Sequence, residues 1–177
     1  MAYAIMEITP FSEVWNDVLG NDGMQLRHIK DHYMLTTDHV KTAIEQNGMA
    51  LKFVPQNLMK PDVLRIALKQ NGMAIEYIPF YILTEYPDLC EIAATQNGFA
   101  VQHMTGFMLC ELPHIYKMAV AQNGLVLQIV YPSKRTFDVC VAAVTQNRDA
   151  IEFVPSNIKD DVMNTVNTPT QVTYQLI

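Results

Sequence analysis

Apolar residues recur along this chain with the three-to-four-residue spacing of a helix that buries one face. In residues 62–71, the charged side chains fall on one side of such a helix, and the other side holds Val63, Leu64, Ala67 and Leu68. A second, shorter apolar run follows at once and is closed by a proline, which cannot continue a helix. The pattern predicts two short helices joined by a tight turn.

The same pattern repeats, and a short polar motif marks each copy. Gln-Asn-Gly occurs four times, with a degenerate copy before and after, so the third motif position falls at Gly23, Gly48, Gly72, Gly98, Gly124 and Arg148. A hairpin of this size cannot bury its apolar face alone, so neighbouring copies must stack. The sequence therefore predicts an all-α solenoid of helix-turn-helix repeats, each about 25 residues long.

Each copy also carries signals for where its first helix begins and ends. Ten residues before the third motif position stand Glu13, Asp38, Asp62, Asp88, His114 and Asp138. An acid there either caps the free backbone N–H groups or lies in the first turn against the helix dipole, and the sequence leaves both open. At the other end, we expect the glycine to adopt the left-handed conformation that closes a helix.

Alanine recurs at one position of each predicted first helix. The equivalent residues are Ala43, Ala67, Ala93, Ala119 and Ala143. Small side chains allow two helices to approach closely, because the distance between helix axes depends on the side chains at the contact. We expect the two helices of each hairpin to cross at this position.

The two ends of the chain differ from the repeats. Residues 3–8 and 171–177 are rich in strand-forming residues, and the second segment alternates as a strand would. We therefore predict an N-terminal arm, a domain of six to seven repeats and an extended or β-like C-terminal arm, at residues 1–11, 12–167 and 168–177. Because the ends of a solenoid lie far apart, each arm is expected either to cover its own repeats or to reach a second copy, forming a homodimer.

Composition and charge narrow the class of function. Half of the residues are apolar, and 12 Lys plus Arg stand against 18 Asp plus Glu, for a net charge of -6. The apolar share is enough for a core, and the acidic balance disfavours a nucleic-acid surface. We find no leader pattern and no apolar stretch of the roughly 18 residues that span a bilayer, so neither secretion nor membrane insertion is expected.

The cysteines carry no sign of catalysis or of a disulfide framework. Cys90 and Cys140 fill a helix position that holds leucine or valine in other copies, which predicts small buried hydrophobic side chains. Cys110 lies in an irregular connection without a histidine near it in sequence. Three cysteines without a paired spacing favour a reducing compartment and no zinc site.

One histidine-rich stretch holds residue types that bind metal ions. His28 and His32 lie four residues apart, with Asp31, Asp38 and His39 close in sequence. Asp31 does not share the helix face of the two histidines, and His28 holds a position that is aromatic in other copies. A core or boundary histidine is the stronger interpretation, so we predict no metal, cofactor or catalytic residue.

The repeated glutamines allow two interpretations. Gln46, Gln70, Gln96, Gln122 and Gln146 would form either a polar ladder for a ligand or a set of hydrogen bonds between repeats. A unique active site has no reason to be copied once per repeat, whereas a structural bond needs the same residue in every copy. The structural interpretation is therefore favoured.

Positions that depart from the repeat are better candidates for contact with a partner. They cluster in the connections and hold mainly aromatic, methionine and basic side chains; the first two types are enriched in interfaces. The predicted contacts are Phe80, Tyr81, Tyr86, Phe107, Met108, Tyr131, Lys134, Arg135 and Tyr174. The alternatives are that the apolar side chains pack beneath a neighbouring repeat and that the basic pair is simply solvated.

Residues 38–55 and 62–79 each contain an acid, then a helix, and then the string Gln-Asn-Gly-x-Ala-Leu-x-Phe/Tyr-Val-Pro. This order resembles the repeat of the uncharacterised family DUF4116. The resemblance covers roughly residues 12–165 and weakens in residues 13–30 and 105–135. The family occurs especially in giant DNA viruses of amoebae and in some bacteria of such hosts, and no activity is assigned to it. The resemblance therefore implies an architecture and a viral source, but no catalytic residue.

Together these features predict a non-enzymatic helical-repeat protein that acts as a protein-interaction or structural module. Its partner is an unidentified protein, and the resemblance places it in the host cytoplasm or the virion. The alternative is a helical-repeat nucleic-acid-binding protein, since other short repeats read RNA one unit at a time. Exposed helix positions of mixed sign, such as Lys41, Arg65 and Glu91, disfavour that alternative.

Overall fold

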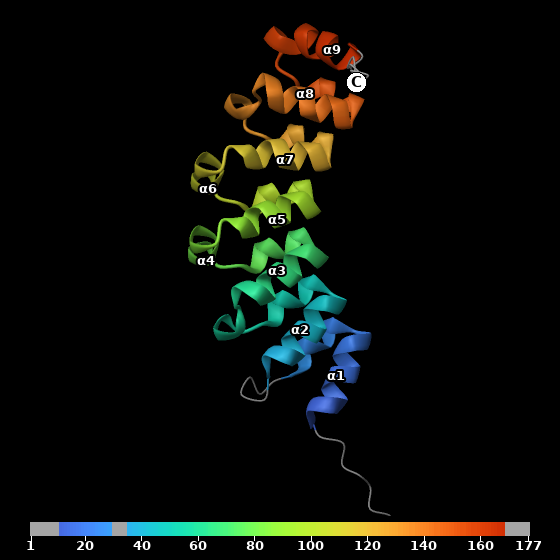
Figure 1. Ribbon diagram of the computed structural model, residues 1–177, viewed down its shortest axis with the longest axis vertical. Helices are drawn as coiled ribbons and strands as arrows, with labels where there is room; N and C mark the ends of the chain where they lie inside the picture. Colours follow the sequence, from blue (N-terminus) through green and yellow to red (C-terminus); the bar gives the residue numbers. More distant parts are fainter. Residues whose placement is uncertain (1–10, 30–34, 169–177) are drawn as a thin grey trace, which may run out of the picture. The chain divides into compact units, whose positions relative to one another are not determined.

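The computed structural model describes residues 11–29 and 35–168, and every element within these ranges is helical. The all-α prediction is therefore confirmed for this part of the chain (Figure 1). The predicted arms lie almost wholly outside the described residues, as does Tyr174.

The chain divides into two compact units, Met1–Gln96 and Asn97–Ile177. The first unit contains α1 (Phe11–Asn21), η1 (Gly23–His28), α2 (Thr37–Gln46), η3 (Gly48–Phe53), η4 (Gln56–Leu58), α3 (Pro61–Gln70), η5 (Gly72–Tyr77), α4 (Phe80–Glu85) and α5 (Asp88–Gln96). The second contains η6 (Gly98–His103), α6 (Gly106–Glu111), α7 (His114–Gln122), η7 (Gly124–Ile129), η8 (Pro132–Lys134), α8 (Phe137–Gln146), η9 (Arg148–Phe153), η10 (Ser156–Ile158) and α9 (Lys159–Asn167).

The first helix of each repeat is an α-helix and the second is a 3-10 helix of six residues. The asparagine of the motif joins them by capping both. Asn47 is the C-cap of α2 in an extended conformation, and its side-chain Oδ1 accepts the N–H of Met49 at 3.0 Å, which caps η3. The same bond recurs at Asn71, Asn97, Asn123 and Asn147. An asparagine cap of this kind contributes roughly 1 kcal/mol to helix stability.

The expected role of the glycine is wrong. No glycine of the described residues has a positive φ, so the left-handed conformation does not close these helices. The glycine instead begins the 3-10 helix and lies against the alanine of the following repeat, where a Cβ on Gly48 would stand 2.5 Å from the carbonyl oxygen of Ala67. Gly23, Gly98 and Gly124 meet Ala43, Ala119 and Ala143 in the same way. These alanines therefore contact the glycine of the preceding repeat, a contact that the predicted crossing within one hairpin did not include.

The acids at the helix starts lie in the first turn, which decides between the two alternatives. Asp38 and Asp62 follow the first residue of α2 and α3. The capping oxygen of α2 comes from Thr36, which accepts the N–H of His39 at 3.2 Å.

Asp62 also pairs with Lys41 of the preceding helix at 3.1 Å, and Lys41 holds the pKa of that carboxyl below its usual value. Arg65 and Asp88 form the equivalent pair at 2.7 Å.

Within each unit the helices form two rows. In the first unit α1, α2, α3 and α5 pack in chain order, and η1, η3 and η5 pack in a second row. The helices α2, α3 and α5 also pack on η1, η3 and η5, respectively. In the second unit α7, α8 and α9 form one row, and η6, η7 and η9 form the other (Figure 1). The apolar faces of the two rows meet and exclude solvent; the fully buried residues at the alanine register are Ala43, Ala67, Ala93, Ala119 and Ala143.

The repeated glutamines connect consecutive repeats through hydrogen bonds to the backbone. Oε1 of Gln70 accepts the N–H of Gly48 at 2.6 Å, and Nε2 of Gln70 donates to the carbonyl of Gln46 at 3.3 Å. The bond to glycine recurs at Gln46, Gln96, Gln122 and Gln146. The structural interpretation of the glutamines is therefore confirmed, because their amides satisfy backbone groups that the helix ends leave open.

The last repeat replaces the glycine by Arg148, and the helix that follows it differs accordingly. α9 carries Val166 where the preceding helices carry the buried alanine, so the close approach of glycine to alanine is not repeated. Arg148 is exposed, and its guanidinium donates to Oδ1 of Asn167 at 2.7 Å, at the end of α9. α9 ends before Pro169, as the sequence predicts.

The contact between glycine and alanine predicts an unusual response to Gly→Ala substitutions. Gly48→Ala places a methyl group against a backbone carbonyl that cannot move freely, so the free energy of unfolding should fall by roughly 1 to 3 kcal/mol in urea denaturation. Gly20→Ala is the matched control, because its Cβ meets only Thr42 at 3.8 Å and the position is inside α1. This control should be about 0.5 to 1 kcal/mol more stable than the natural chain. Equal effects of the two substitutions would contradict the packing role of Gly48.

The glutamine bonds predict a second stability effect. Gln70→Ala removes the acceptor for the Gly48 N–H and the donor for the Gln46 carbonyl, so it should lower the free energy of unfolding by roughly 1 to 3 kcal/mol. Lys69→Ala, at the neighbouring exposed position, should change it by less than about 0.5 kcal/mol. If Gln70→Ala were as mild as the control in the same denaturation experiment, these bonds would not hold the repeats together.

Candidate functional site

The polar positions that every repeat shares are occupied by structural hydrogen bonds, so the candidate site lies where repeats differ. The differences concentrate after the 3-10 helices. Three copies place a Val-Pro or Ile-Pro pair there, at residues 54–55, 78–79 and 154–155. The connection then holds a short 3-10 turn, η4, η8 or η10, in three copies and a longer helix, α4 or α6, in two. These two helices hold several of the predicted contacts, and each belongs to a different unit.

In the first unit, α4 exposes two aromatic side chains. Phe80 and Tyr81 are 46% and 57% exposed, whereas the next two residues, Ile82 and Leu83, face inward at 6% and 3%. Figure 1 shows α4 projecting to one side of the row of α3 and α5. Tyr86, which ends the helix, is half-buried, and a hydrogen bond with the Glu85 carboxylate raises the pKa of its hydroxyl.

In the second unit, α6 repeats this arrangement at the same register. Phe107 is 61% exposed and aligns with Tyr81, while Leu109 and Met108 are buried. Met108 is therefore an interior residue at 4% exposure and does not lie at the surface as a partner contact would. Thr105, which stands in place of the usual proline, caps α6 by accepting the Met108 N–H at 3.4 Å.

The basic pair of the second unit divides into a surface residue and a structural one. Arg135 donates to the carbonyls of Val130 at 2.9 Å, Gln128 at 3.1 Å and Phe153 at 2.8 Å, so its guanidinium joins the end of η7 to the end of η9. The predicted contact of Arg135 with phosphate or an acidic partner conflicts with this use of its N–H groups. Lys134 is half-buried at the end of η8.

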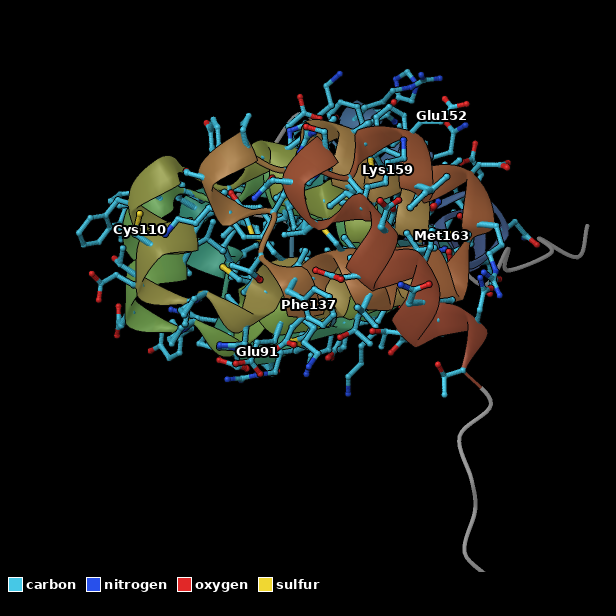
Figure 2. The ribbon with its side chains drawn as sticks, turned by 90° about the horizontal axis from the view of Figure 1, so that it is seen from above. Glu91, Cys110, Phe137, Glu152, Lys159 and Met163 are labelled. Carbon is cyan, nitrogen blue, oxygen red and sulfur yellow. The ribbon has the colours of Figure 1, made fainter. Side chains whose placement is uncertain are left out.

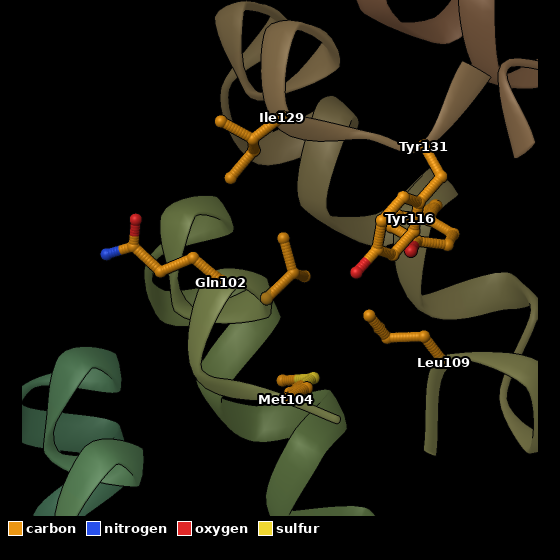
Figure 3. A pocket seen from close by; sticks show the side chains of 7 residues that line it. Gln102, Met104, Leu109, Tyr116, Ile129 and Tyr131 are labelled. Atoms are coloured by element: carbon orange, nitrogen blue, oxygen red, sulfur yellow. The ribbon is translucent and has the colours of Figure 1, made fainter. Parts of the chain in front are cut away.

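A pocket of about 210 Å³ lies beside these departures in the second unit. It is lined by Val101, Gln102, Met104, Leu109, Tyr116, Ile129 and Tyr131. Figure 3 shows the rings of Tyr116 and Tyr131 together on one side of the pocket, with Ile129 and Gln102 on the other. Tyr131 is 58% exposed and forms part of the rim, whereas Tyr116 is buried at 3%.

The environment of Tyr116 keeps its hydroxyl neutral. Burial raises the pKa of this hydroxyl, and the nearby Tyr131 and Cys110 raise it further. Tyr116 therefore presents a phenol rather than a phenolate to the pocket. None of its lining residues is an acid, a base or a histidine.

Sequence reasoning missed both the pocket and the role of Tyr116. A signal was present, because Tyr116 fills the register that holds Val40, Leu64, Cys90 and Cys140 in other copies. A tyrosine at a register that otherwise holds smaller side chains indicates that the packing around this position differs from that in the other repeats. The register alone does not say that the altered space stays partly empty.

The three thiols fall into two classes, as predicted. Cys90 and Cys140 are fully buried, and burial raises the pKa of Cys90 to about 12 and raises that of Cys140 as well. Cys110 is exposed, and Figure 2 shows it at the outer edge of the second unit. A buried thiol with a raised pKa is a poor nucleophile, so Cys90 and Cys140 act as packing residues.

The histidine stretch does not form a cluster in the described residues. His28 is exposed at the end of η1 and accepts a bond from Arg27 at 2.9 Å, so its predicted core or boundary position is wrong. His39 is buried at 1% beside its capping partner Thr36, and Asp31 and His32 lie outside the described residues. Across residues 11–29 and 35–168, no three His, Cys, Asp or Glu side chains converge as metal ligands would.

None of the helices in these ranges has the length and apolar content of a membrane span.

The thiol environments predict one fast and two protected cysteines. A chromogenic disulfide reagent at pH 8 should titrate about one thiol per native chain and all three in guanidinium chloride, since only Cys110 is accessible. Cys110→Ser should abolish the native reaction. Rapid native reaction of this variant would contradict the burial of Cys90 and Cys140.

Comparisons with known proteins bear on one part of the chain. The model of the family called "Domain of unknown function (DUF4116)" matches residues 40–83, which run from α2 to α4. Neither the curated proteins nor the solved structures provide a match. Residues 40–83 thus support the resemblance to DUF4116 that the repeat motif indicates.

Proposed function

We propose that this chain is a non-enzymatic helical-repeat protein whose repeats stack as a solenoid and present short aromatic helices to a protein partner. The observation that carries the proposal is the shared design of α4 and α6. Each occupies the same place in its repeat, buries one apolar pair and exposes an aromatic side chain, Tyr81 or Phe107. The fold does not need these exposed rings, because other copies place Asn57 or Ser133 at that register.

The energetics of interfaces favour a protein partner for such residues. An exposed aromatic ring keeps apolar surface in contact with water. Burial of that surface against a partner is favourable by roughly 25 cal/mol per Å². Aromatic residues dominate the few positions that carry most binding energy in protein interfaces. The net charge of -6 opposes binding to a polyanion at these sites.

The resemblance to DUF4116 supports a viral source as part of this proposal, together with a place in the host cytoplasm or the virion. Homodimers through the terminal arms belong to the proposal as well. Both arms lie almost wholly outside the described ranges. The proposed contacts of α4 and those of α6 do not depend on the arms.

The proposal is tested by capturing partners with a double variant and a matched control. Tyr81→Ser with Phe107→Ser removes both exposed rings, and Val14→Ser with Val18→Ser removes exposed apolar side chains from α1. Full-length chains are expressed in host cells, cross-linked and purified, and the co-purified proteins are quantified by mass spectrometry. We expect one protein to be retained by the natural chain and by the control but reduced at least about tenfold in the ring variant.

Two outcomes would contradict the proposal. Equal recovery with the ring variant and the natural chain would show that α4 and α6 do not bind the partner. A partner lost on nuclease treatment, with tight binding in a low-salt gel shift, would favour nucleic-acid binding instead. Thermal unfolding of both variants checks that they remain folded.

A further inference from the structure

The pocket of the second unit exists because three of its positions depart from the repeat. Ile129 lies at a register that carries an aromatic ring in other copies, namely Phe53, Tyr77 and Phe153. Tyr131 stands where those copies have proline, and Tyr116 stands where they have smaller residues. One ring is thus missing from the repeat pattern, and two other rings form a wall beside the space.

The size of the space fits a single aromatic ring. Its volume is about 210 Å³, and an apolar cavity of about 150 Å³ is enough to hold benzene in a protein interior. A six-membered ring with one small substituent therefore fits without displacing the walls. A larger fused ring system would project beyond the rim.

The chemistry of the walls selects a neutral ring over a charged group or an aliphatic chain. No lining residue carries a charge that would pair with an ion, and an unpaired charge is costly to move out of water. The faces and edges of Tyr116 and Tyr131 favour stacking or edge contacts with another ring. The thioether of Met104, which is 7% exposed, adds the kind of sulfur that contacts aromatic edges favourably.

The pocket also opens to solvent at its rim. Ile129 and Tyr131 are 39% and 58% exposed, whereas Val101, Leu109 and Tyr116 are at most 5% exposed. A ring can therefore enter from solution while the chain that carries it stays outside. Tyr131 is itself an exposed aromatic residue that departs from the repeat, so the pocket continues the kind of surface proposed for α6.

We propose that this pocket binds one neutral aromatic ring, a phenol or phenyl group, on a side chain of the protein partner. That the ring belongs to a protein partner rests on the proposed function. That the ligand is a neutral aromatic ring rests on the pocket alone. The partner side chain fills the place that Phe153 and its equivalents occupy in the regular repeats. Tyrosine and phenylalanine are the residues that satisfy this description.

The test is a titration of the full chain followed by methyl NMR signals of Val101, Leu109 and Ile129. The probes are p-cresol, which is the tyrosine side chain, and N-acetyltyrosine amide, which adds the peptide backbone. We expect saturable ring-current shifts of these methyl groups with both probes. Cyclohexanol and 4-hydroxybenzoate, which lack the ring or carry a charge, should bind at least about tenfold more weakly.

Two variants and one control identify the binding site. Ile129→Phe restores the ring of the other repeats and should abolish the p-cresol shifts while keeping or raising the unfolding midpoint. Tyr131→Ser alters an exposed rim residue, so the fold should persist, and p-cresol should bind roughly threefold to tenfold more weakly. Tyr81→Ser, on α4 of the first unit, should leave the titration unchanged.

Each outcome bears on the inference. No saturable shift with p-cresol, equal shifts with cyclohexanol, or unchanged affinity in both pocket variants would overturn it. Binding of p-cresol without binding of N-acetyltyrosine amide would overturn the partner side chain and leave a small free phenol as ligand. If the probes bind as expected but the ring variant of α4 and α6 still captures its partner, the proposed function fails and the pocket stands. If capture is lost in that variant and p-cresol does not bind, the pocket fails and the proposed function stands.

Discussion

The stacking of this protein depends on one contact between consecutive repeats, in which a glycine backbone lies against an alanine of the next helix. The missing Cβ of Gly48 allows the carbonyl of Ala67 to approach, and the same close approach brings Gln70 within reach of the Gly48 N–H. Packing and hydrogen bonding therefore have a common geometric cause. Substitution of the glycine or of the glutamine would therefore weaken the contact between two layers whose apolar faces are buried against each other.

That constraint explains where the chain is free to vary. In the regular repeats the asparagine, glycine and glutamine are committed to caps and hydrogen bonds, and the alanines of the shared register are fully buried. The connection after the 3-10 helix carries no such requirement. It accommodates a single turn in η4, a full helix in α4 and α6, and the tyrosine of the pocket rim at Tyr131.

The candidate site lies at these variable connections and not at a motif that every repeat shares. Arg135 shows how a residue that departs from the repeat can still be structural, because its three N–H contacts hold two 3-10 helices together. Met108 shows the same for an apolar residue, since α6 turns it inward beside Leu109. Phe107 and Tyr81 differ from them because the helices that carry them direct the rings to solvent.

The sequence by itself determined the repeat length, the α-helix that opens each repeat and the burial of Cys90 and Cys140, because these follow from local spacing and from residue type at a fixed register. It did not predict α4 and α6, which lie in segments that departed from the repeat. It did not determine that the second helix is a 3-10 helix, since a six-residue apolar run fits either geometry. The purpose of Gly48 also required the tertiary structure, because its contact lies 19 residues away, at Ala67. The pocket beside Tyr116 likewise depends on the tertiary structure. The volume left between side chains is set by how two repeats pack and not by either repeat alone.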